Sequence, residues 1–117
     1  MNPYEGDYKK VLFVCSAGLL RSPTAAVVAH HQFGWNTRSC GAYKEYALIP
    51  VSSLLCYWAD DIYCMEKEHA EIIHKLFKPM HLEYKTFVLN IPDKFPYMDV
   101  KLQELIVEKL SNADVRL

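Results

Sequence analysis

The stretch from Val11 to Thr24 constrains the fold of this chain more than any other part of the sequence. It opens with four apolar residues and Cys15, without alternating polar side chains, which is typical of a strand buried on both faces in a parallel sheet. Ser22 and Pro23 then predict a helix start, with Ser22 as N-cap and Pro23 at the first helical position. The sequence therefore predicts a strand, a tight loop and a helix, with a thiol and the Arg21 guanidinium at opposite ends of the loop.

The chemistry of this loop favours an oxyanion ligand. A loop wrapped around a helix N-terminus directs backbone N–H groups inward and forms an anion site. The same groups favour the thiolate form of Cys15, and the Ser22 hydroxyl can donate a hydrogen bond to it. Arg21 offers a planar pair of donors that matches two oxygens of a phosphate. We therefore expect a thiolate nucleophile beneath a bound phosphate, which is the arrangement that phosphoryl transfer to cysteine requires.

The same residues resemble a known motif. Val14-Cys15, five further residues and Arg21-Ser22-Pro23 are similar to the phosphate-binding loop of the low-molecular-weight protein tyrosine phosphatases, in particular a compact branch of predicted tyrosine phosphatases of about this length. The resemblance extends over residues 10–110 and includes the segments 62–69 and 91–95. It implies that the substrate phosphate is bound by the loop residues Ser16, Ala17, Gly18, Leu19, Leu20, Arg21 and Ser22.

The loop departs from the Cys-x-Gly-Asn-x-Cys-Arg-Ser pattern of that family at three positions. Ala17 replaces glycine, Gly18 replaces asparagine and Leu20 replaces the second cysteine. Gly18 accepts positive φ as asparagine does, but it lacks the side-chain hydrogen bonds that brace the loop. Leu20 removes the partner for a protective disulfide with the nucleophile. The resemblance therefore implies the same reaction type, with altered bracing and redox regulation.

A proton donor is expected near the loop, because phosphoryl transfer from a poor leaving group needs an acid. The resemblance places this acid at Asp93, in Ile91-Pro92-Asp93-Lys94-Phe95, where the family has Asp-Pro-aromatic. The alternative for Asp93 is a turn after proline. The rival acid is Asp99, which is better explained as the N-cap of a last helix. Phe95 and Tyr97 are candidates to flank an aryl phosphate, and packing is the alternative for both.

Strand and helix signals alternate along the chain, which predicts right-handed crossovers and a parallel sheet. Gly34 ends the first helix, and the loop 43–50 is shorter than in related phosphatases, so we expect a shallow, open site. The further expected strands are 35–42, 60–65 and 86–91, and the polar residues 36–39 favour the sheet edge for the first of them. The further expected helices are 51–59, 66–77 and the segment that Asp99 caps.

The fold class that follows is a single α/β domain over residues 1–117, with residues 1–8 as a loose, polar lead-in. With the strand order that the resemblance implies, it is a three-layer sandwich with a four-stranded parallel sheet in the order 2-1-3-4, flanked by helices. At 117 residues and 51% hydrophobic, the chain can bury one core.

Charge and cysteine usage exclude several classes of function. The net charge is −1 and there is no basic block, so we expect no nucleic-acid partner and no membrane anchor. Four cysteines without paired spacing read as free thiols, three of them buried in apolar runs, which indicates a reducing, cytoplasmic setting. The histidines lack the spacing of zinc ligands and are expected on the surface or on helix flanks. We expect no metal and no other cofactor.

Three functions fit these observations. The first is a cysteine-dependent phosphomonoesterase with a phosphocysteine intermediate, acting on phosphorylated protein or a small aryl phosphate and releasing inorganic phosphate. Leu19 favours phosphotyrosine, because the resemblance associates a small threonine there with phosphoarginine. The second is an arsenate reductase, whose thiol relay would pass through Cys64 and is broken because Glu71 stands where a further thiol is needed. The third is a module that binds phosphate or a phosphoprotein without turnover.

Overall fold

Four parallel strands form the centre of the computed structural model, which describes residues 8–115. The sheet order is β2-β1-β3-β4, as predicted. The strands are β1 (Lys10–Cys15), β2 (Asn36–Gly41), β3 (Asp61–Cys64) and β4 (Thr86–Val88). The central strand β1 pairs on one side with β2 and on the other with β3, so that Val14 lies between Cys40 and Cys64. The predicted lead-in falls almost wholly outside the described residues.

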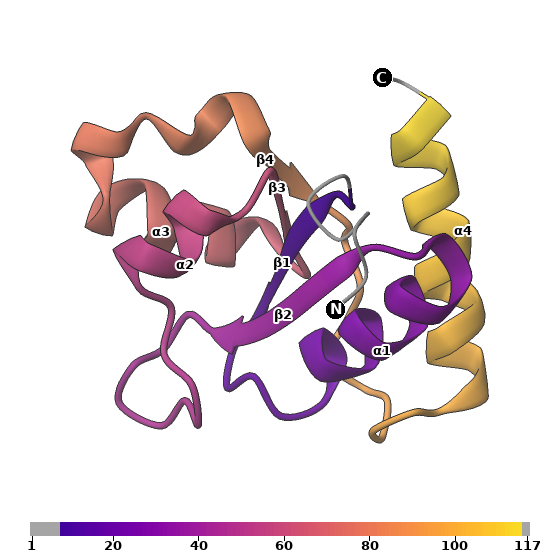
Figure 1. Cartoon of the computed structure of the whole chain (residues 1–117). Helices are drawn as coiled ribbons and strands as arrows, with labels where there is room; N and C mark the ends of the chain where they lie inside the picture. Colours follow the sequence, from indigo (N-terminus) through magenta and orange to yellow (C-terminus); the bar gives the residue numbers. More distant parts are fainter. Residues whose placement is uncertain (1–7, 116–117) are drawn as a thin grey trace, which may run out of the picture.

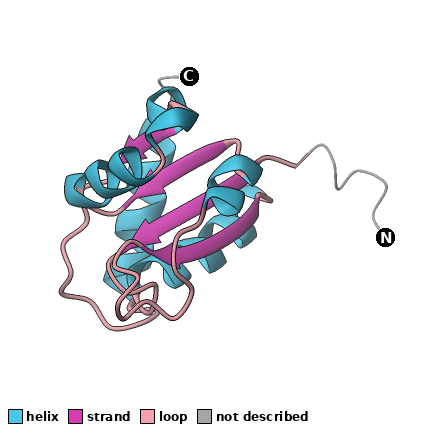
Figure 2. Cartoon of the chain, turned by 90° about the vertical axis from the view of Figure 1, so that its left-hand side faces the viewer, coloured by secondary structure: helices cyan, strands magenta, loops and turns pink. Residues whose placement is uncertain are grey.

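Helices cover both faces of this sheet, which explains why β1 is apolar throughout (Figures 1 and 2). On one face, α1 (Arg21–Phe33) and α4 (Val100–Val115) pack over a core that includes Phe13, Tyr63 and Ile106. On the other face, α2 (Ser53–Trp58) and α3 (Lys67–Leu76) pack over a second core that includes Leu12 and Ile73. Two 3-10 turns, η2 (Lys78–Met80) and η3 (Leu82–Lys85), lead from α3 into β4.

The helix ends follow the predicted caps with one exception. Gly34 ends α1 at φ 73°, and Asp99 Oδ1 accepts from the backbone N–H groups of Lys101 and Leu102 at the start of α4. The prediction of Ser22 as an N-cap is wrong, because α1 begins at Arg21 and the capping position, Leu20, makes no side-chain capping bond. The first-turn N–H groups of α1 are thus left without a side-chain cap at the end that faces the loop.

Several segments are shorter than predicted, and the differences concern their ends. β4 stops at Val88, although the N–H groups of Leu89 and Ile91 still donate to the carbonyls of Cys64 and Met65. The expected edge position of the second strand is confirmed, since β2 lies at one end of the sheet order. Within residues 8–115, no helix is long and apolar enough to cross a membrane.

Candidate active site

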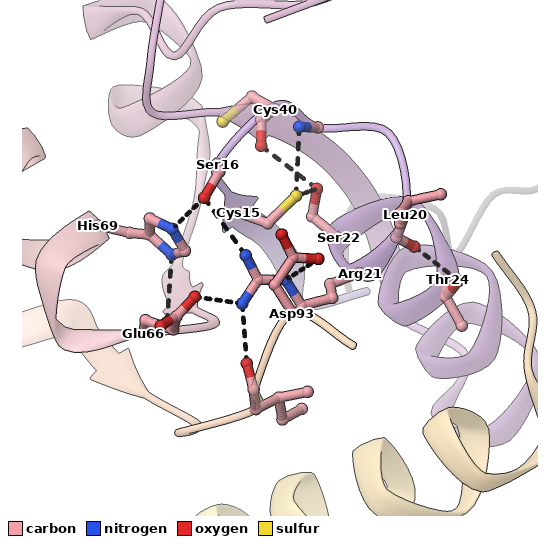
Figure 3. Close-up of polar contacts among 12 residues, drawn as sticks. Cys15, Ser16, Leu20, Arg21, Ser22, Thr24, Cys40, Glu66, His69 and Asp93 are labelled. Carbon is pink, nitrogen blue, oxygen red and sulfur yellow. Dashed lines mark hydrogen bonds and ion pairs between the residues drawn. The ribbon is translucent and has the colours of Figure 1, made fainter. Parts of the chain in front are cut away.

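The loop between β1 and α1 lies at the carboxyl end of the sheet, where β2 approaches it closely (Figures 1 and 3). Gly18 has φ +74°, and a Cβ there would lie 3.0 Å from the backbone carbon of Cys40 and from the backbone nitrogen of Gly41. A Cβ on Gly41 would in turn lie 2.6 Å from the carbonyl carbon of Ala17. Glycine at both positions therefore lets the loop rest directly on the end of β2.

Backbone hydrogen bonds from the next segment hold the loop in its curvature. The N–H groups of Ala42, Tyr43 and Leu48 donate to the carbonyls of Cys15, Ser16 and Ala17, at 2.8, 3.1 and 3.2 Å. Because a trans peptide points its C=O and N–H in opposite directions, carbonyls bonded outward direct the N–H groups that follow them inward. Backbone bonds thus brace a loop that has no asparagine side chain to do so. Sequence reasoning missed this brace, because backbone donors carry no side-chain signal.

Cys15 lies at the inner end of the cradle, as we call the curved loop of residues 15–22, and is 3% exposed. Its Sγ accepts from the Gly18 N–H at 3.2 Å and lies 3.1 Å from Ser22 Oγ (Figure 3). Ser22 Oγ also lies 3.3 Å from the Cys40 carbonyl oxygen, to which it can donate. When the thiol is ionised, the Ser22 hydroxyl can donate its hydrogen bond to the sulfur instead of to this carbonyl oxygen. Ser22, the second residue of α1, therefore engages Cys15 and the Cys40 carbonyl oxygen from within the first turn of the helix.

Arg21 is a buried cation held from several sides (Figure 3). Its Nη1 donates to Glu66 Oε2 at 2.5 Å and to the Ile91 carbonyl oxygen at 2.8 Å. Its Nη2 donates to Ser16 Oγ at 3.3 Å, and its Nε lies 3.6 Å from Asp93 Oδ1. These partners fix the guanidinium plane before any ligand arrives. Glu66 follows Cys-Met in the segment that carried the resemblance, but its pairing with Arg21 was not anticipated.

His69 was expected on the surface or on a helix flank. It lies in the first turn of α3 but is only 1% exposed, and its Nε2 lies 3.0 Å from Ser16 Oγ. The backbone N–H of Glu66 donates to His69 Nδ1 at 3.1 Å, as part of a capping box at the start of α3. Because Nδ1 is the acceptor there, the ring proton lies on Nε2 and is donated to Ser16. Burial, and then the positive charge of Arg21, lower the pKa of His69, which favours this neutral ring.

A cavity of about 320 Å³ opens above the loop. Its lining residues are Cys15, Ser16, Ala17, Leu19, Leu20, Arg21, Tyr46 and Asp93. The structure therefore brings Asp93 to the same cavity as Cys15 and Arg21, 78 positions after the cysteine and 72 after the arginine in the chain.

The remaining predicted site residues lie outside this lining. Gly18 and Ser22 contact the site through the Cys15 sulfur. Phe95 packs against the core beneath α1 and α4, and Tyr97 is half exposed. Asp99 is occupied as the cap of α4.

The aromatic residue that lines the cavity is Tyr46. It belongs to the loop 43–50, which was expected only to be short. Its ring stacks on Tyr43 with centroids 5.5 Å apart. The only sequence signal for it was that the corresponding region frames the substrate in related phosphatases.

The other cysteines are buried free thiols that the site does not use. Burial raises the pKa of Cys56 to about 11 and raises the pKa values of Cys40 and Cys64 further above the ordinary range. Cys64 belongs to the core beneath α2 and α3, whereas Cys15 belongs to the core on the opposite face. Among residues 8–115, no group of three or more histidine, cysteine or acidic residues could hold a metal ion.

Solved structures of low-molecular-weight phosphatases share this fold over nearly their whole length. Wzb of Vibrio vulnificus, in complex with benzylphosphonate, is 23% identical with a TM-score of 0.74, covering 94% of this chain and 99% of that one. The low molecular weight protein tyrosine phosphatase SP-PTP of Streptococcus pyogenes is 17% identical with a TM-score of 0.73, covering 93% of each chain. The YwlE arginine phosphatase of Geobacillus stearothermophilus is 21% identical with a TM-score of 0.66, covering 92% and 96%.

No protein-family model matches the chain, and no curated protein matches it by sequence. The structural matches confirm the predicted fold, which is that of the low-molecular-weight protein tyrosine phosphatases.

Proposed function

We propose that this protein is a cysteine-dependent phosphomonoesterase that hydrolyses phosphotyrosine in proteins or small aryl phosphates. The observation that carries the proposal is the common cavity, in which the Cys15 sulfur accepts an inward N–H group while the buried guanidinium of Arg21 and the exposed carboxyl group of Asp93 line the same space. A nucleophile, a fixed cation and a carboxyl group around one cavity are the parts that phosphoryl transfer through a covalent intermediate requires.

In the first step, the Cys15 thiolate attacks phosphorus and an S–P bond forms as the P–O bond to the leaving group breaks. Asp93, in its protonated form, gives its proton to the leaving oxygen, and the alcohol or phenol departs. In the second step, the carboxylate of Asp93 takes a proton from water, which attacks the phosphocysteine. Inorganic phosphate leaves and the thiolate is restored. Arg21 and the inward N–H groups stabilise the charge on the equatorial oxygens in both steps.

The walls of the cavity favour an aromatic leaving group. Leu19, Leu20 and Tyr46 supply apolar surface beside the loop, and each of them is at least two-fifths exposed. A phenyl ring can pack against such a wall, whereas the charged guanidino group of phosphoarginine would lose hydration there. Among the similar structures, one holds benzylphosphonate and another is an arginine phosphatase, so the preference needs a direct comparison of phosphotyrosine with phosphoarginine.

The expected setting is the cytoplasm, because a nucleophilic thiol persists in a reducing compartment. Phosphorylated proteins are the expected partners, and inorganic phosphate, the product, is an expected competitive inhibitor.

The test compares wild-type protein with Cys15→Ser, using para-nitrophenyl phosphate hydrolysis and vanadate binding. We expect the variant to lose turnover and to retain vanadate binding, because the cradle remains while the nucleophile is removed. Turnover of even a tenth of wild type in the variant would overturn the covalent mechanism. A wild-type protein that binds vanadate but hydrolyses neither this substrate nor phosphotyrosine would be a binding module instead. Thioredoxin-dependent reduction of arsenate in a parallel assay would identify the protein as an arsenate reductase instead.

A further inference from the structure

The Ser16 side chain joins two elements of the site in a way that the loop backbone does not explain. Its Oγ lies 3.0 Å from His69 Nε2 and 3.3 Å from Arg21 Nη2, and Ser16 itself lines the cavity beside Cys15 (Figure 3). Among residues 16–20, serine is the one polar side chain, since the others are alanine, glycine and two leucines. We infer that the Ser16 hydroxyl donates a hydrogen bond to the bound phosphoryl group and that His69 is the positioning residue that directs it.

The direction of the hydroxyl follows from counting protons. A serine oxygen has two acceptor positions and one hydrogen. Arg21 can only donate, and His69 donates from Nε2 because its Nδ1 accepts from the Glu66 N–H. The two acceptor positions of Ser16 are therefore filled, and its own hydrogen is left for a third group. A phosphoryl oxygen bound above Cys15 is an acceptor in the cavity that Ser16 lines.

The surroundings of His69 keep its ring in the tautomer that this arrangement needs. Arg21, Glu66, Glu68 and Asp93 act on it electrostatically, and the Tyr43 ring meets it edge-on with centroids 6.3 Å apart. The phenol of Tyr43 bonds to Glu68, which raises its pKa to about 12 and leaves it uncharged at neutral pH. A proton added to Nδ1 would face the N–H of Glu66 and break the capping contact. The neutral ring, with its proton on Nε2, is thus the form that fits.

The inference rests on the proposed function, but its test reads oxyanion affinity rather than turnover. Phosphate and vanadate binding are measured in a Cys15→Ser background, where the cradle remains without the nucleophile. We expect Ser16→Ala to weaken binding by about 10- to 100-fold, since a lost hydrogen bond to a charged group has that effect. In the enzyme with Cys15 intact, kcat/KM should fall by at least the same factor, because the charge on the oxygens is bound through the transition state.

His69→Asn tests the positioning role, because the asparagine oxygen can replace Nδ1 as the capping acceptor while the Nε2 donor is lost. We expect His69→Asn to weaken phosphate binding when Ser16 is unchanged. When Ser16→Ala is already present, His69→Asn should have no further effect, because the effects of two residues that act through one contact are not additive. His74→Asn is the matched control, since His74 lies on the same helix away from the cavity. In the Cys15→Ser background, the phosphate affinity with His74→Asn should equal that of the Cys15→Ser parent.

Two results would overturn the inference. Unchanged phosphate affinity in Ser16→Ala would show that the hydroxyl donates elsewhere. Additive losses from Ser16→Ala and His69→Asn would show that His69 acts through helix α3 and not through Ser16. Either result leaves the covalent mechanism standing if Cys15→Ser still abolishes turnover, whereas turnover by Cys15→Ser would refute the proposed function itself.

Discussion

Replacing Arg21 by lysine should separate the charge of this side chain from its planar geometry. A lysine nitrogen can take the place of Nη1, where it would keep the contacts to Glu66 and to the Ile91 carbonyl oxygen. It cannot also supply the donors at Nη2 and Nε, which lie toward Ser16 and Asp93 on the cavity side. The substitution therefore keeps the buried charge paired and removes the planar pair of donors on the cavity side, where we expect phosphate to bind.

The loss of one well-placed transition-state contact costs about 3–4 kcal/mol, which corresponds to a fall in kcat of roughly 10²–10³-fold. The effect on folding should be much smaller, at about 1 kcal/mol, because the ion pair with Glu66 survives. Initial rates with para-nitrophenyl phosphate measure the first quantity and urea unfolding the second.

Arg38→Lys is the matched control for this substitution. Arg38 lies on β2 with its guanidinium 4.5 Å from the ring centroid of Trp58, away from the cavity, so its activity should stay within about twofold of wild type. Near-normal turnover in Arg21→Lys would refute the reasoning and reduce Arg21 to a structural cation.

Three further predictions concern the acid, the loop and the histidine. Asp93→Asn should slow phosphotyrosine hydrolysis by roughly 10²–10⁴-fold and para-nitrophenyl phosphate hydrolysis less, because the better leaving group needs less protonation; a selective defect in Asp99→Asn instead would transfer the role. Gly18→Ala should lower the free energy of unfolding by about 1–2 kcal/mol, measured by urea denaturation, because alanine is strained at φ +74°; unchanged stability would contradict the close approach to β2. Because the pKa of His69 is lowered in the folded state, the unfolded chain binds a proton at this ring at higher pH than the folded chain does, so stability should fall as pH drops below about 6.5. The measurement is the urea midpoint between pH 8 and 5, and His69→Asn should reduce its fall at acid pH. The same pH dependence in wild type and His69→Asn would refute this prediction.

The stretch around Cys15 could be read from the sequence because its signals are local. An uninterrupted apolar run, a thiol and a Ser-Pro pair follow one another along the chain, and the structure places them as a strand, a loop and a helix in that order. Asp99 could be read for the same reason, since an N-cap acts on residues two and three positions later. Asp93 was reached through the resemblance and through its expected place at the carboxyl edge of the sheet, because nothing in its own neighbourhood indicates Arg21.

The parts of the site that escaped prediction depend on contacts between distant segments. The brace on the loop uses backbone N–H groups of residues 42–48, which every sequence possesses. For Ser22 the sequence predicted both a cap on the helix and a contact with the Cys15 sulfur, and the folded structure has the contact without the cap. Tyr46 lines the cavity, because the loop 43–50 lies beside the site. Phe95 and Tyr97 do not line it, and the partly buried Phe95 packs against the core instead.

The most direct test of the covalent mechanism is to trap the intermediate. Protein mixed with phosphotyrosine and quenched in acid within milliseconds should yield, by mass spectrometry, a peptide that carries one phosphoryl group on Cys15, and Cys15→Ser should yield none. Asp93→Asn, which lacks the base for the second step, should accumulate more of the adduct from para-nitrophenyl phosphate than wild type does. Steady turnover of phosphotyrosine with no phosphorylated Cys15 at any quench time would contradict the account.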